Sequence, residues 1–72
     1  MIVLAVLNDQ FEAGRIHSLL EAKGFHPEPL GVASHLFAAG GGKDFTIRVP
    51  KEEAKRAAEL LESEGLGKFI WR

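Results

Sequence analysis

The chain has 72 residues, of which 46% are hydrophobic and 26% charged, with a formal net charge of −1 and no cysteine. These values are typical of one small soluble domain, and they exclude disulfides and cysteine-based zinc sites. The near-neutral charge disfavours nucleic-acid binding, which needs a basic surface. The first apolar run, Ile2–Leu7, is too short for a membrane span or a signal peptide, so we expect no membrane association and a cytoplasmic location.

The first predicted element is a strand over Ile2–Leu7, because six apolar residues without a break indicate a strand covered on both faces. A helix is expected next, with Asp9 as its N-cap and Glu12 at capping-box spacing. We expect this helix to stop at Gly24 in the left-handed conformation. Its apolar stripe is formed by Ala13, Ile16, Leu19 and Leu20.

The middle of the chain is rich in proline and glycine. Phe25–Leu30 predicts a short edge strand, because Pro27 and Pro29 remove two N–H groups from the same side of an extended segment. Residues 31–44 predict a long flexible loop, with its most flexible point at Gly40–Gly42. Loops of this length in small domains are commonly functional or disordered.

The last part of the chain predicts a strand, a helix and a strand. Phe45–Val49 alternates apolar and polar residues, which is typical of a half-buried strand, and Pro50 ends it. A helix follows that Gly65 closes, and Lys68–Arg72 indicates a final strand. The apolar stripe of this helix is formed by Ala54, Ala57, Ala58 and Leu61.

This order of elements predicts a single α+β domain over residues 1–72, a ferredoxin-like βαββαβ sandwich. Right-handed crossovers then give a four-stranded sheet of order 4-1-3-2 with two helices on one face. Ile2–Leu7 and Phe45–Val49 become central neighbours, which we expect to run parallel. The segment with the prolines and the C-terminal strand form the two edges.

The sheet face away from the helices is the first candidate site. Because side chains alternate along a strand, either Ile2, Leu4 and Val6 or Val3, Ala5 and Leu7 must lie on this open face. We take the second set as the candidate, together with Thr46 and Arg48 of the third strand. A stripe of aliphatic side chains on a central strand favours a covered surface, and hence a homo-oligomer, either a dimer or a trimer. In the alternative, Val32, Leu36 and Phe37 of the long loop fold back over this face.

Two stretches of the chain carry a family resemblance. They are Asn8–Gly24 and Phe45–Leu61, the second containing Val49-Pro50-Lys51-Glu52-Glu53-Ala54. The chain resembles a small bacterial family named prokaryotic signal-transducing proteins on the strength of its fold. The resemblance implies a ferredoxin-like sandwich related to the PII-type nitrogen regulators, and it brings no catalytic residues. PII-type regulators meet partners through a long loop that corresponds to residues 31–44, but their nucleotide-binding features are not matched, so ATP binding is not expected.

The remaining motifs do not indicate a bound cofactor, a metal site or catalytic activity. Gly40–Lys43 is followed by Asp44 and a strand, whereas a phosphate-binding loop needs Ser or Thr and a helix there. The histidines lack chelating spacing, and no paired carboxylates or nucleophile motif appears. Trp71 is expected either to pack onto the core or to lie across a seam between subunits.

We therefore expect a non-enzymatic regulatory or protein-interaction module. It would self-associate through the open sheet face and present the 31–44 loop, with His35, Leu36 and Phe37, to a protein partner. The alternative is an ACT-like sensor of amino acids, although Asn8–Phe11 lacks the glycine of such sites. RNA binding ranks last, because the outward positions of the central strands are not aromatic.

Overall fold

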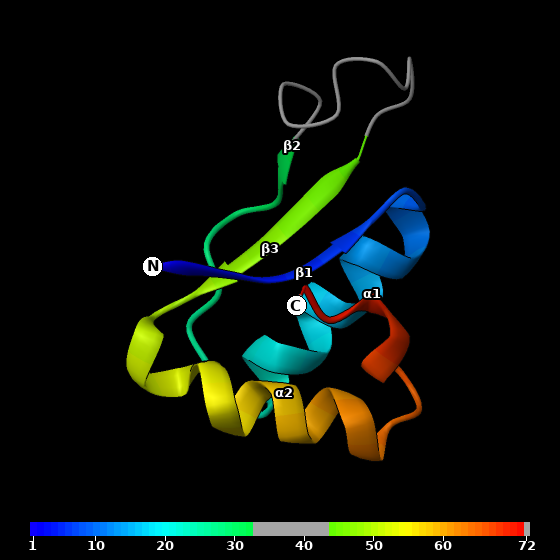
Figure 1. The fold of residues 1–72 in the computed structure, drawn as a ribbon. Coiled ribbons are helices and arrows are strands. Elements are labelled where there is room, and N and C mark those ends of the chain that lie inside the picture. Colours follow the sequence, from blue (N-terminus) through cyan, green and yellow to red (C-terminus); the bar gives the residue numbers. More distant parts are fainter. Residues whose placement is uncertain (33–43, 72) are drawn as a thin grey trace.

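The computed structural model describes residues 1–32 and 44–71, and it shows a small α+β fold (Figure 1). Strand β1 (Ile2–Leu7) leads into helix α1 (Gln10–Ala22), which is followed by the short strand β2 (Gly31–Val32). The rest of the described chain comprises strand β3 (Phe45–Val49), the 3-10 turn η2 (Lys51–Glu53), helix α2 (Ala54–Ser63) and the 3-10 turn η3 (Gly67–Phe69).

The sheet has the strand order β1-β3-β2, and both pairings are antiparallel. The predicted contact between the first and third strands is confirmed, but their predicted parallel direction is wrong. Helix α1 carries the chain back across the sheet, so β2 runs in the same direction as β1. Strand β3 pairs with β2 in the opposite direction, and it is therefore antiparallel to β1 as well.

The two predicted edge strands are not formed as expected. In Phe25–Leu30, the Glu28 N–H donates to the Arg48 carbonyl oxygen at 2.9 Å, but Pro27 and Pro29 on either side have no N–H to extend the ladder. Regular pairing with β3 starts instead at Gly31, inside the predicted loop.

At the other edge, η3 occupies residues that were predicted to begin a strand. The C-terminal segment then touches β1 through one antiparallel bridge between Ala5 and Ile70 (Figure 1). The Trp71 N–H adds a hydrogen bond of 2.9 Å to the Leu4 carbonyl oxygen. A four-stranded sheet is therefore not confirmed by the residues that the structure describes.

The predicted start of α1 is confirmed. The Asp9 carboxylate accepts hydrogen bonds from the backbone N–H groups of Phe11 and Glu12, at 2.8 and 3.3 Å. These bonds satisfy donors that have no partner inside the first turn of a helix. The Glu12 side chain lies 2.6 Å from the guanidinium group of Arg15.

Both predicted glycine stops are also confirmed. Gly24 and Gly65 have φ angles of 88° and 77°, in the left-handed region that favours glycine. After each glycine, an N–H donates back into the last turn of the helix, from Phe25 to the Leu20 carbonyl in α1. The equivalent bond in α2 runs from Leu66 to the Leu61 carbonyl. This pattern is the Schellman motif, which brings an apolar side chain back against the helix.

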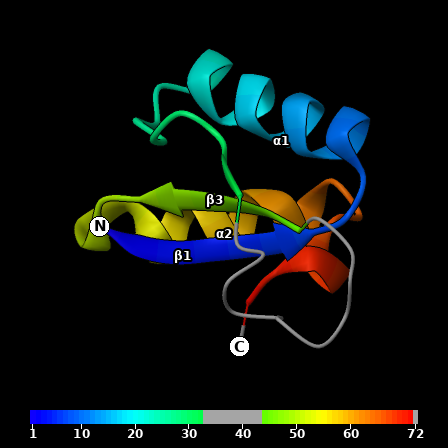
Figure 2. The same cartoon turned by 90° about the horizontal axis from the view of Figure 1, so that it is seen from above.

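One hydrophobic core joins both helices to the sheet, and it contains the predicted apolar stripes of the two helices. Its buried members are Leu4, Ala5, Leu7, Ala13, Ile16, Leu20, Ile47, Val49, Ala57 and Leu61. Figure 2 shows β1 and β3 in front of α2, so the sheet face toward the viewer is turned away from that helix. The sheet face opposite the core is therefore a separate surface of the molecule.

Two glycine substitutions should change stability in opposite directions. Gly24→Ala should destabilise the fold by roughly 1–2 kcal/mol, because a Cβ is strained at this φ although no atom lies within 4 Å of it. Gly14→Ala should stabilise it by roughly 0.5–1 kcal/mol, because Gly14 lies inside α1 and has free space around its Cβ position. Urea unfolding of the two variants measures both changes in the free energy of unfolding. If both substitutions changed it in the same direction, this assignment of the helix end would be wrong.

Candidate interaction surfaces

The residues predicted for the open sheet face are divided by an irregularity in β1. Val3 pairs with Arg48 and Ala5 pairs with Ile47, so Leu4 is an extra residue opposite a continuous β3. An extra residue of this kind is a β-bulge, and it changes which side chains share a face.

Ala5 and Leu7 are consequently not on the open face, which corrects the prediction. They are 0% and 4% exposed, and they pair with the core-facing side of β3. Val3 and Val6 take the positions opposite Arg48 and Thr46, and these four residues share the face turned away from the core. Val3, Thr46 and Arg48 lie on this face, and their role at an interface stays a prediction.

Two polar side chains of β3, those of Arg48 and Thr46, contact neighbouring segments on this face. The Arg48 guanidinium group is 3.7 Å from the Glu28 carboxylate and donates to the Met1 carbonyl oxygen at 3.5 Å. Thr46 is only 8% exposed, and its hydroxyl oxygen would lie 2.8 Å from a Cβ atom built on Gly31. A side chain at position 31 would therefore force the Thr46 hydroxyl or the strand pairing to shift.

Trp71 belongs to the same sheet face and does not pack into the core. Ile70 is extended and bridges to Ala5, so its side chain shares the core face of β1. The next residue, Trp71, then points to the opposite face, and it lines a shallow hollow together with Val6. Its side chain is 50% exposed. Of the two predicted roles for Trp71, packing in the core is wrong, and a role at a subunit seam stays a prediction.

The remaining predicted site residues, His35, Leu36 and Phe37, lie outside the described residues, and so does the Gly40–Lys43 sequence.

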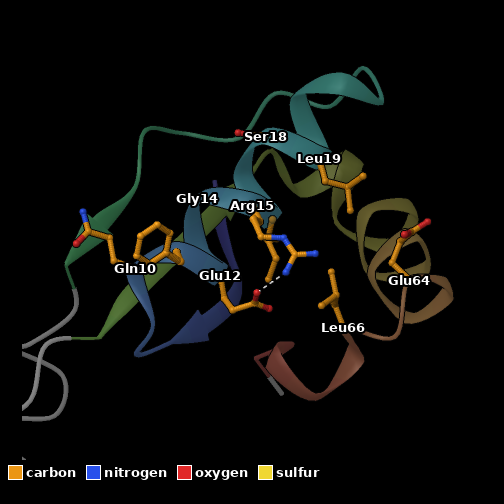
Figure 3. A pocket seen from close by; sticks show the side chains of 10 residues that line it. Gln10, Glu12, Gly14, Arg15, Ser18, Leu19, Glu64 and Leu66 are labelled. Atoms are coloured by element: carbon orange, nitrogen blue, oxygen red, sulfur yellow. Dashed lines mark hydrogen bonds and ion pairs between the residues drawn. The ribbon is translucent and has the colours of Figure 1, made fainter.

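A second surface, which the sequence analysis missed, is a groove beside α1. It has a volume of about 870 Å³ and lies between the outer side of α1 and the end of α2 (Figure 3). Apolar side chains of Ile16, Leu19 and Leu66 line it. Phe11 stands at its edge and is 86% exposed, which is an unusual place for a large aromatic side chain.

The groove also carries charged side chains. Figure 3 shows Arg15 extending from α1 toward the wall that contains Glu64 and Leu66, with a short ion pair to Glu12. A signal for this surface was present in the sequence, because Phe11 falls outside the apolar stripe of its helix. The position of the second wall depends on the packing of α2, which the sequence pattern does not give.

Two histidine contacts hold the segment after α1 in place. The His26 backbone N–H donates to one Glu53 carboxylate oxygen at 2.8 Å, and the His26 ring donates to the other at 2.6 Å. The His17 ring lies within 2.8 Å of the Glu28 carbonyl oxygen. His17 is half-buried by this contact.

Within residues 1–32 and 44–71, no cluster of three or more histidine and carboxylate side chains is arranged to hold a metal ion. The described helices include none with the length and apolarity required to cross a membrane. Comparisons of the chain with models of protein families, with curated proteins and with solved structures find no match.

The contact between His26 and Glu53 should make stability depend on pH. Hydrogen bonds from the His26 ring and backbone lower the pKa of Glu53 below its ordinary value of 4.5. Because the folded state then binds a proton less readily than the unfolded chain, this contribution is complete above that value and is lost as the pH falls. Urea unfolding from about pH 6 to about pH 3 should show a smaller loss of stability in Glu53→Gln than in the natural sequence.

Glu52→Gln is the matched control for this experiment, because it removes one negative charge from the same turn without touching the His26 contact. An identical pH dependence in Glu53→Gln and the natural sequence would show that the contact does not contribute.

Proposed function

We propose that this protein is a non-enzymatic interaction module that self-associates through the sheet face turned away from the helices. The supporting observation is the half-exposed indole of Trp71 beside Val6 on that face. Val3 and the exposed Arg48 extend the same surface along the two paired strands. Aromatic, aliphatic and arginine side chains together are typical of the centres of protein interfaces.

Association also has a physical reason in the size of the domain. A single hydrophobic core in a chain of 72 residues provides only a few kcal/mol of net stability. Many small domains without disulfides or metals gain further stability from a second subunit. Covering Trp71 and its aliphatic neighbours would stabilise the assembly by about 25 cal/mol for each Å² of apolar surface that is removed from water.

We also propose that the domain is a ferredoxin-like sandwich with the strand order 4-1-3-2. The antiparallel bridge between Ala5 and Ile70 supports it, because the bridge brings the C-terminal segment to the outer edge of β1. That edge is where the fourth strand of this order belongs. At the other end of this order the second strand lies beside the third, as β2 lies beside β3 here.

Sedimentation velocity at increasing micromolar concentrations tests the proposal. We expect the natural chain to form a dimer or trimer, and Trp71→Ser to shift the equilibrium toward the monomer by about ten-fold or more. The loss follows from removing a large, half-exposed apolar side chain at the β1 edge of the surface.

Phe11→Ser is the matched control, because it also replaces an exposed aromatic residue but lies on α1. We expect it to leave the association constant unchanged. A natural chain that stays monomeric, or an equal effect of both substitutions, would refute self-association through the sheet. A rise in melting temperature with a free amino acid would instead favour the sensor hypothesis.

A further inference from the structure

We propose that the C-terminal residues Ile70 and Trp71 form an autoinhibitory contact, which keeps the outer edge of β1 from pairing with β1 of a second copy. This inference concerns the edge of the sheet and not its open face, so it does not depend on the self-association proposed above. It rests on the composition of β1, on the position of the C-terminal segment and on the way in which the opposite edge of the sheet is protected.

Strand β1 has a sequence that favours pairing with another strand. It stands at one end of the order β1-β3-β2, and its six residues, Ile2–Leu7, are all apolar, without a proline, a glycine or a charge. An uncharged segment of this kind pairs with copies of itself when its edge is exposed. Proteins block such edges with lysine, proline, a bulge or a covering segment. The bulge at Leu4 interrupts β1 once, but it leaves residues 5–7 as regular strand.

The C-terminal segment lies where a further strand would pair with β1. Figure 2 shows it on the side of β1 away from β3. Ile70 bridges to Ala5, and the Trp71 N–H donates to the Leu4 carbonyl oxygen at 2.9 Å. Within residues 1–32 and 44–71, no other segment pairs with this edge. The segment therefore occupies backbone groups that a strand of a second copy would need.

The attachment of this segment is limited, so it can open while the core stays folded. It pairs with β1 through one bridge, next to one backbone hydrogen bond. Phe69 and Ile70 are only half-buried where they pack against the core. Segments with few buried contacts open locally, at a lower free energy than the whole domain. An autoinhibitory contact requires this property.

The opposite edge of the sheet is protected in a different way. Strand β2 has only two residues, and Pro27 and Pro29 before it carry no N–H group that could donate to another strand. Strand β1 has neither the short length nor the prolines of that edge. Its protection therefore depends on the C-terminal segment.

Two substitutions of one residue test this inference. Trp71→Pro removes the N–H that donates to Leu4 and places a ring against that carbonyl group, whereas Trp71→Ser keeps the N–H. Both variants lack the indole, so they differ only in how well the segment covers β1. In sedimentation velocity, we expect Trp71→Pro to associate at least about ten-fold more strongly than Trp71→Ser. Equal association of the two variants would overturn the proposal.

A second pair of substitutions, made in the Trp71→Ser chain, avoids the proline. Ile70→Ala loosens the C-terminal segment, and Leu19→Ala removes a half-buried side chain that packs against the same core from α1. Ile70→Ala should strengthen association by about ten-fold, while Leu19→Ala should leave it unchanged. If both strengthened it equally, general loss of stability would be the cause, and the proposal would be wrong.

A lysine on β1 identifies the surface that associates. Val6→Lys, added to Trp71→Pro, should return the chain to the monomer, because the lysines of two paired strands repel each other. Phe11→Lys adds the same charge to an exposed position of α1 and should have no effect. Association that Val6→Lys leaves intact would refute pairing through β1. A monomeric natural chain would refute the proposal for the open face alone, because the comparison of Trp71→Pro with Trp71→Ser keeps its expected result.

Discussion

The structure depends on the antiparallel pairing of β1 with β3. These two strands supply Ala5, Ile47 and Val49 to the core, all fully buried, and both helices pack against this pair. Complete burial of a Val or Ile side chain contributes about 1.5–3 kcal/mol, so a few such residues account for a large share of the stability of a small domain. The bridge from Ile70 and the hydrogen bond from Glu28 attach the two outer segments to the same pair.

The bulge at Leu4 decides which side chains this pairing leaves outside the core. Side chains alternate strictly along a regular strand, so one extra residue transfers every later position to the other face. Ala5 and Leu7 thereby turn toward the helices, and Val6 joins Val3 on the open face. The surface proposed for self-association is thus a product of one irregularity in one strand.

The second candidate surface is connected to the way in which the helices end. The Schellman motif after α2 brings Leu66 back toward the helices, where it forms one wall of the groove, as Phe25 returns to the core after α1. The groove is lined by α1 and the end of α2, whereas Trp71 lies with Val6 on the open sheet face. The groove and the hollow beside Trp71 are therefore lined by different residues.

The sequence by itself determined the features that depend on neighbouring residues: the cap at Asp9, the stops at Gly24 and Gly65, and the apolar stripes of both helices. These follow from hydrogen bonds and side-chain spacing within about one turn of the helix. The tertiary structure alone decided the direction of β3, the bulge in β1, the short edges of the sheet and the groove beside Phe11. Each of these arises where segments distant in the chain pack together, and a local pattern contains no information about which atoms will meet there.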